Sequence, residues 1–265
     1  MRTAMIGMLL GVMVQAGCGA AGEDASIALA NAAGKPDGEA AVTVHLRRDG
    51  LRRFFFDPSG WRHCLSEHDR WESRYRVPDY VFGREPNYFL AACKPLLPKS
   101  GRALAVADGE GRNGVWLAEQ GLDVVSLDFS PAAQAKAATL ARERGVAMTI
   151  ERGDVHDWTY PEASFDVVCE IFTQFSTPAE RAMKWAGMRK ALKPGGLLII
   201  QGYTPKQLQY GTGGPKEIEN LYTRAMLEAA FRDFQDMSIV EEELELHEGT
   251  SHGGMSAVIN LIARK

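Results

Sequence analysis

Apolar and polar positions follow two alternating periods from about residue 100 onward. Short apolar runs, typical of buried strands, occupy residues 103–107, 123–127, 146–150, 165–171 and 197–201. Segments with helical spacing lie between them, the clearest at 131–144 and 178–192. Strands that alternate with helices predict an α/β fold, a mainly parallel sheet with helices on both faces.

Capping and helix-breaking residues support these boundaries. Ser130 and Pro131 suit the N-cap and first position of a helix, and Gly121 suits a helix end. Residues 193–196, Lys-Pro-Gly-Gly, break the chain before the fifth strand. Two further strand-like runs, 237–246 and 256–263, flank a glycine-containing turn and predict a hairpin.

The first 41 residues differ from the rest. Arg2 and the apolar run 4–14 are typical of an export signal, too short to span a bilayer. Residues 16–18, Ala-Gly-Cys, resemble a lipoprotein cleavage box, in which Cys18 would carry the lipid; a misassigned start or a simple tail is the alternative. We therefore divide the chain into a signal-like segment 1–18, a disordered linker 19–41, an N-terminal helical segment 42–95 and an α/β domain 96–265.

Composition narrows the function classes. The net charge of −4 over 265 residues argues against a phosphate-neutralising surface, so we expect no nucleic-acid partner. The four cysteines are scattered and form no CxxC pair, which predicts neither a metal site nor a disulfide framework. Cys169, within an apolar run, is predicted to be a core residue rather than a nucleophile.

A glycine loop follows the first strand. Gly109 and Gly111 allow the backbone to approach a ligand closely, and the helix that opens after them offers free N–H groups. Asp128 closes the next strand about 20 residues on, the spacing of a carboxylate that accepts the hydroxyls of a ribose. Taken alone, this pattern fits NAD, FAD and S-adenosylmethionine (SAM) about equally, and a tight turn with a solvated Asp is the plainer interpretation.

Further motifs separate these ligands. Gly153-Asp154-Val155 follows the third strand, Phe165-Asp166-Val167-Val168 opens the fourth, and residues 192–197 precede the fifth. With these motifs in this order, residues 70–265 resemble the class I SAM-dependent methyltransferases. The stretches 71–90, 109–117, 203–215 and 245–247 look most similar to bacterial small-molecule methyltransferases of the tellurite-resistance and thiopurine-methyltransferase-like type.

The resemblance implies a Rossmann-like seven-stranded sheet in the order 3-2-1-4-5-7-6, SAM as the cofactor and a small-molecule methyl acceptor. The scattered cysteines and the short apolar run predict no metal and no membrane-spanning segment. The residues it assigns to the cofactor are Trp71, Tyr80, Asp108, Gly109, Gly111, Arg112, Asn113, Asp128, Phe129, Asp154, Val155 and Glu170. Trp71, Tyr75, Tyr80 and Phe82 are expected to form a lid over the methionine end.

Acceptor-side candidates come from three places. His247 is the first choice, because the resembling enzymes can carry a histidine at the entry to the final hairpin; a surface histidine is the alternative. Glu170, at the end of the fourth strand, and Tyr203 complete the catalytic set. We expect His252 to be a loop residue, whereas Tyr210 is a second pocket candidate. Arg74, Arg76 and Arg84 are candidates for attracting an anionic acceptor, with solvent-facing side chains as the alternative.

One departure from the resembling family concerns the first motif. Ala105 stands where the family usually has an acid, and Ala107 stands where it has the first glycine, with Asp108 available for part of the polar role. The alternative is therefore a protein that binds SAM or S-adenosylhomocysteine (SAH) without catalysis. A nucleotide-dependent oxidoreductase is disfavoured, because the C-terminal residues leave no room for a separate substrate domain. The cofactor favours the cytoplasm, and the N-terminus favours export with a lipid anchor on Cys18.

Overall fold

The computed structural model describes residues 12–16, 25–31, 42–46, 66–249 and 252–265. The chain divides into two compact units, Met1–Cys64 and Leu65–Lys265. In the first unit, β1 (Val12–Ala16), β2 (Ala25–Asn31) and β3 (Val42–Leu46) form an antiparallel sheet in that order. Cys18 lies outside the described residues, so the cleavage box stays a prediction. β1 lies within the predicted signal segment 1–18, and β2 lies within the predicted linker 19–41.

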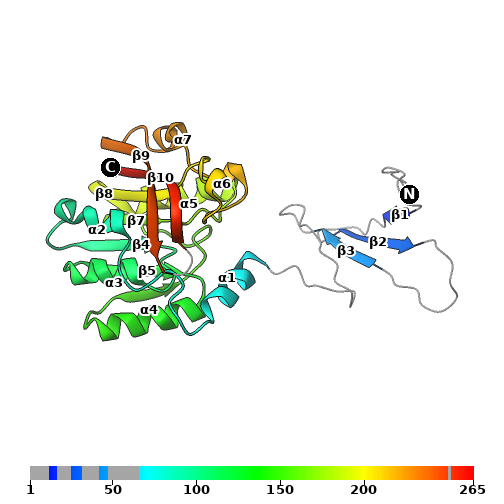
Figure 1. The fold of residues 1–265 in the computed structure, drawn as a ribbon, viewed down its shortest axis with the longest axis horizontal. Coiled ribbons are helices and arrows are strands. Elements are labelled where there is room, and N and C mark those ends of the chain that lie inside the picture. Colours follow the sequence, from blue (N-terminus) through cyan, green and yellow to red (C-terminus); the bar gives the residue numbers. More distant parts are fainter. Residues whose placement is uncertain (1–11, 17–24, 32–41, 47–65, 250–251) are drawn as a thin grey trace. The chain divides into compact units, whose positions relative to one another are not determined.

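The second unit is built on one seven-stranded sheet (Figure 1). The strands are β4 (Arg102–Val106), β5 (Asp123–Asp128), β6 (Thr149–Arg152), β7 (Phe165–Ile171), β8 (Leu192–Tyr203), β9 (Gln235–Glu248) and β10 (His252–Arg264). Their order, β6-β5-β4-β7-β8-β10-β9, confirms the predicted topology. Only β10 runs against its neighbours, pairing antiparallel with both β8 and β9.

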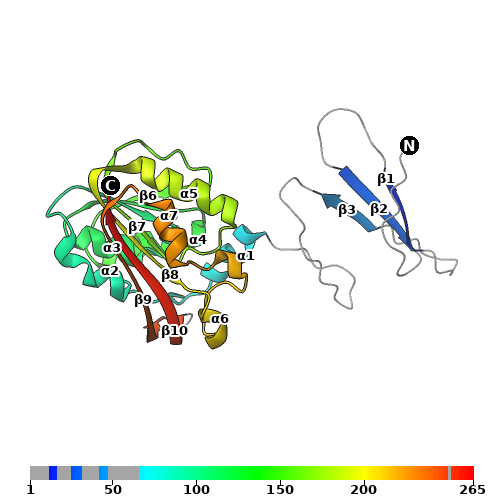
Figure 2. The same cartoon turned by 90° about the horizontal axis from the view of Figure 1, so that it is seen from above.

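Helices cover both faces of this sheet (Figure 2). They are α1 (Glu67–Tyr75), α2 (Tyr88–Ala92), α3 (Arg112–Glu119), α4 (Pro131–Glu143), α5 (Pro178–Ala191), α6 (Gln207–Tyr210) and α7 (Arg224–Ala230), with 3-10 turns Lys94–Leu96 and Ile218–Asn220. One core cluster packs Leu90 and Leu117, of α2 and α3, on the sheet. The other face packs against Trp185, which is on α5, and against Phe231, which directly follows α7.

Local chemistry sets most element ends. Ser130 caps α4 by accepting from the Ala133 N–H, and Pro131 takes the first helical position, as predicted. The third strand begins three residues later than predicted, because the Val146 N–H donates to the Ala141 carbonyl at 3.0 Å and closes the end of α4. The fifth begins earlier, because Leu192 already pairs with Phe165; the register then shifts around the Pro-Gly-Gly turn.

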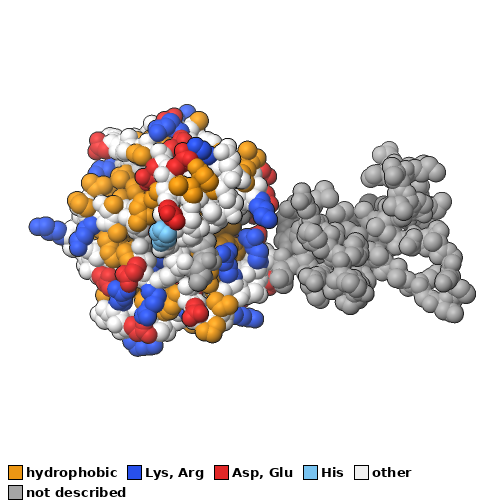
Figure 3. Space-filling view, in the orientation of Figure 1, with side chains coloured by type: hydrophobic (Ala, Val, Ile, Leu, Met, Phe, Trp, Pro, Cys, Tyr) orange, Lys and Arg blue, Asp and Glu red, His pale blue; other side chains and the backbone are white. Residues whose placement is uncertain are grey.

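The surface mixes charges of both signs. Figure 3 shows Lys and Arg side chains interspersed with Asp and Glu on the face in view. Within the described part of the chain, no helix is long and apolar enough to cross a bilayer.

Candidate functional site

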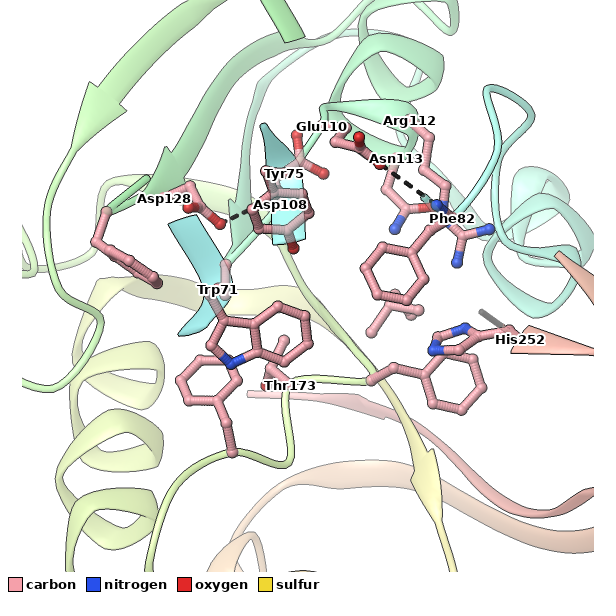
Figure 4. A pocket seen from close by; sticks show the side chains of 16 residues that line it. Trp71, Tyr75, Phe82, Asp108, Glu110, Arg112, Asn113, Asp128, Thr173 and His252 are labelled. Atoms are coloured by element: carbon pink, nitrogen blue, oxygen red, sulfur yellow. Dashed lines mark hydrogen bonds between the residues drawn. The ribbon is translucent and has the colours of Figure 1, made fainter. Parts of the chain in front are cut away.

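A pocket opens at the carboxyl ends of β4, β5 and β7, with α1 and the start of β10 beside it (Figure 4). Parallel α/β sheets bind their ligands at this edge. Its lining residues are Trp71, Tyr75, Phe82, Ala107, Asp108, Gly109, Glu110, Arg112, Asn113, Asp128, Phe129, Ile171, Phe172, Thr173, Phe175 and His252. The lining thus combines the rings of six Phe, Tyr and Trp side chains and one His with carboxylates at the ends of two neighbouring strands.

The glycine loop needs its glycines for space. Gly111 has a φ of 86°, and a Cβ there would lie 2.6 Å from the Cβ of Ala137 on α4. Gly109 has a φ of 58°, and a Cβ there would lie 2.8 Å from the Tyr75 hydroxyl oxygen. Ala107, where the resembling family has glycine, also has a positive φ, 49°. An L-residue in that region costs about 1–2 kcal/mol, so the loop is strained at this position.

Asp128 lies at the centre of the loop's hydrogen bonds. Oδ2 accepts from the Gly109 N–H at 2.9 Å, and Oδ1 accepts from the Ser130 N–H at 2.8 Å. Each oxygen keeps capacity for a further donor. Burial raises the pKa of this carboxyl to about 6. The geometry therefore fits a carboxylate that receives ribose hydroxyls.

Asp108 supplies the acid that the first strand lacks. Ala105 is buried in the same core cluster as Leu117 and does not line the pocket. Asp108 accepts from the Gly114 N–H at 3.1 Å and from the Ser126 hydroxyl at 2.6 Å. Burial raises the pKa of this carboxyl as well. Its hydrogen bonds hold the loop to the start of α3, so its first role is to shape the loop.

Three of the four residues predicted to form a lid, Trp71, Tyr75 and Phe82, line the pocket. Trp71 and Tyr75 of α1 stack with centroids 5.8 Å apart, and Phe82 lies 6.2 Å from Trp71. The Arg74 guanidinium lies 5.1 Å from the centres of both the Trp71 and Phe82 rings. Tyr80 departs from the prediction: its hydroxyl donates to the Lys136 carbonyl on α4, outside the pocket.

Of the two histidines in the hairpin, His252 lines the pocket and His247 does not, which is the reverse of the prediction. His252, predicted to be a loop residue, begins β10, lines the pocket and is 8% exposed, with its ring 4.6 Å from those of Phe82 and Phe172. Its Nδ1 lies 3.7 Å from the nearer Glu248 oxygen and has no hydrogen-bond partner among the described residues. Burial lowers the pKa of His252, which keeps its ring neutral near pH 7. The His247 side chain is 75% exposed and does not line the pocket.

Glu170 lies under the pocket rather than in it. Its carboxylate is fully buried and forms an ion pair with Lys184 at 2.8 Å. It also accepts from Thr173, Trp185 and Tyr222 at 2.5 to 2.7 Å. A carboxylate with this many donors is committed to the fold, so the geometry favours a supporting role for Glu170 over contact with a ligand.

The structure places the other predicted residues as follows. Arg112 lines the pocket, but its guanidinium bonds Glu248 at 2.7 Å. Asn113 accepts from the Asn87 N–H, which ties α2 to the loop. Val155 is a core residue, and Asp154, outside the pocket lining, is bonded by His68 and His156.

Of the two tyrosines, only Tyr203 lies close to the pocket. Its ring packs 4.6 Å from Phe172 and 5.9 Å from His252, and its buried hydroxyl has no partner in the described part of the chain. Tyr210 bonds Glu243 at the surface.

The residues after β7 were missed by sequence reasoning. Phe172 has a φ of 55°, which turns the chain so that residues 171–173 and Phe175 all reach the pocket. Ligand sites gather at the carboxyl ends of parallel strands, and for β7 this rule pointed to Glu170. Extending the same rule over the next few residues would have found Phe172 and Thr173.

Comparisons with known proteins agree with this geometry. A family model described as "Methyltransferase domain" matches residues 103–196, which hold the loop, Asp128 and β7. Demethylmenaquinone methyltransferase of Deinococcus radiodurans is 32% identical over 43% of this chain and 48% of that protein. The chain thus spans about half the length of the curated relatives it matches.

Solved structures share the fold. A SAM-dependent methyltransferase from Methanosarcina mazei superposes with a TM-score of 0.56 at 20% identity, over 68% of this chain and 98% of that one. TehB from Haemophilus influenzae gives a TM-score of 0.55 at 15% identity, over 84% of this chain and 80% of that one. The sheet order and the solved structures thus agree on the fold, and residues 103–196 match the methyltransferase domain model.

Proposed function

We propose that this protein transfers the methyl group of SAM to a small molecule held beside His252. The observation that carries the proposal is Asp128, whose buried carboxylate faces the glycine loop with acceptor capacity left on both oxygens. Six aromatic rings around the same pocket favour a cationic ligand such as a sulfonium.

Different residues would bind the ribose, the adenine and the methionine end of the cofactor. Asp128 would accept the ribose hydroxyls, and Asp154 would accept the amino group of the adenine. The loop from Ala107 to Gly109 and the rings of Trp71 and Tyr75 would enclose the methionine end. When bound, SAM would supply a methyl group on its sulfonium sulfur, and S-adenosylhomocysteine would be the leaving group.

His252 is the proposed acceptor-side residue, in place of His247 and Glu170. Its neutral imidazole can take a proton from a hydroxyl or amine acceptor, whereas a thiolate or an oxyanion needs no base. The aromatic walls exclude water and hold the two reactants in line. Tyr203, packed beside His252, would shape the acceptor end of the pocket. The name of the Deinococcus relative gives it the acceptor demethylmenaquinone, which supports a small-molecule acceptor here.

A protein that binds SAM or SAH without catalysis is the second candidate. The strained Ala107 in the first motif favours it.

Calorimetric titration of the full chain with SAM, SAH and NAD tests the cofactor. Assays of SAH release with thiols and with selenium or tellurium oxyanions then test catalysis. Binding of the sulfur nucleosides with product formation supports the enzyme, and binding without product supports the second candidate. Failure to bind either sulfur nucleoside rules out both.

For location, we propose the cytoplasm, where SAM is made, with a lipid anchor on Cys18 as the alternative. Fractionation of tagged protein with and without Cys18→Ala decides between them. Release from the membrane pellet by the substitution would establish the anchor.

A further inference from the structure

His68, on the first turn of α1, makes two contacts with the ends of the sheet. Its ring stacks on Phe129, with centroids 4.3 Å apart and an interplanar angle of 24°. Its Nε2 lies 2.8 Å from Oδ2 of Asp154. Phe129 follows β5 and Asp154 follows β6, so one imidazole connects α1 to two neighbouring strand ends.

These two contacts are the ones that an adenine ring would use. Phe129 directly follows Asp128, so a ribose on Asp128 carries its base toward the Phe129 ring. Asp154 offers the amino group one oxygen, because its Oδ1 already accepts from the backbone N–H and the ring Nδ1 of His156, at 3.0 and 2.8 Å. The oxygen that remains is the one that His68 contacts.

We propose that His68 competes with the adenine ring of SAM for the Phe129 face and for Asp154 Oδ2. An imidazole and an adenine each present a flat aromatic face and an N–H donor in the ring plane, and both cannot occupy this place at once. His68 therefore acts as a built-in competitor that sets the affinity for the nucleoside. The inference rests on the proposed function, which takes SAM as the ligand with its ribose on Asp128 and its adenine amino group on Asp154.

The competitor can leave without moving the rest of the lid. The His68 side chain is 54% exposed, so its ring can rotate into solvent. Further along α1, Glu72 accepts from the Ser130 hydroxyl and the Ala132 N–H, which fixes the helix on α4. Trp71 and Tyr75 can thus stay over the pocket while His68 turns away.

Removal of the competitor should tighten binding. When a protein occupies its own site, the apparent dissociation constant rises in inverse proportion to the fraction of open molecules. We expect His68→Ala in the full chain to bind SAH about fivefold more tightly, which corresponds to an open fraction of about one fifth in the wild type. Adenosine should gain by a similar factor, because the competition concerns the base alone.

Calorimetry with SAH and adenosine measures this, with His247→Ala as the matched control, since that side chain is 75% exposed elsewhere. Tighter binding by His68→Ala alone supports the competition. SAH affinity that is unchanged or weaker in His68→Ala, beside a wild type that binds, overturns the competition and leaves the proposed function standing. If the wild type, His68→Ala and His247→Ala all fail to bind SAH, both the proposed function and this inference are refuted.

An NMR experiment on the unmutated chain gives a second readout. The ring protons of His68 lie over Phe129 and should carry a ring-current shift. Saturation with SAH should move that signal to the position of an exposed histidine. A signal that stays in place while SAH binds would refute the competition.

Discussion

At the residue scale, Asp128 links cofactor binding to pH. Its pKa is raised to about 6 by burial, and ribose hydroxyls bind the ionised form. The affinity for SAH should therefore be constant above about pH 7 and fall by up to about tenfold per unit below pH 6. Calorimetry between pH 5 and 8 measures this slope. Asp128→Asn should bind more weakly at pH 7.5 and lose the slope; a slope that persists in this variant would assign it to another group.

The same raised pKa has a consequence for stability. An acid whose pKa rises on folding from 3.8 to about 6 binds its proton more tightly in the folded state. Its favourable contribution is present below pH 3.8 and is lost as the pH rises through 6. Asp128→Asn should therefore remove a loss of unfolding free energy between about pH 4 and 6, measured by urea denaturation across that range.

His252 and His247 form a natural pair for a test of catalysis. If His252 accepts the proton, His252→Gln should lower kcat by about 100-fold and leave the SAH dissociation constant unchanged. His247→Gln, on the exposed neighbouring strand, should change neither quantity. Equal loss of SAH binding and turnover in His252→Gln would make that residue structural.

Ala107 and Ala105 test the altered loop. Ala107→Gly should raise the free energy of unfolding by about 1 kcal/mol, because glycine accepts the positive φ without strain. Ala105→Gly, two residues earlier in β4, should lower it by about the same amount, because glycine costs conformational entropy in a strand. Thermal denaturation of both variants measures the contrast; a loss of stability in Ala107→Gly would mean that the loop is not strained there.

At the scale of elements, a buried ion pair joins β7 to α5. Lys184 bonds Glu170 as well as the carbonyl and hydroxyl of Thr173, which lines the pocket. The pair thus supports the loop after β7 from below.

Lys184→Met should lower the unfolding free energy by about 3–5 kcal/mol, because it leaves a buried carboxylate without its cation. Lys206→Met, at the exposed pair with Glu243, is the control and should have little effect. Chemical denaturation compares the two. A small effect of Lys184→Met would mean that Glu170 takes up a proton when its partner is lost.

Arg112 and Glu248 connect two other elements. Glu248, the last residue of β9, accepts from Arg112, from the Asn87 amide and from the Tyr88 N–H. Burial alone would raise the pKa of Glu248, but the adjacent His252 and Arg112 lower it to about 2. The last hairpin is therefore tied to the start of α3, which fixes His252 relative to the glycine loop.

At the scale of the whole molecule, the second unit holds the complete sheet and every pocket residue. We expect residues 65–265 alone to unfold cooperatively and to bind SAH as tightly as the full chain. Circular dichroism and calorimetry on both proteins test this. Weaker binding by the shorter chain would show that residues 1–64 contribute to the site.

The succession of strands and helices along the chain, the glycine loop and the position of Asp128 could be predicted from the sequence, because they depend on local periodicity and on short spacings. Which distant side chains meet depends on the packing of the whole fold. His247 and His252 lie in one hairpin, yet strand register and packing bury His252 beside Phe172 and leave His247 in solvent. Likewise, Glu170 has the sequence position of a site residue, but Lys184, Trp185 and Tyr222 reach it only across the packed fold. Burial and partners set the role of such groups, and both arise from contacts between residues far apart in the chain.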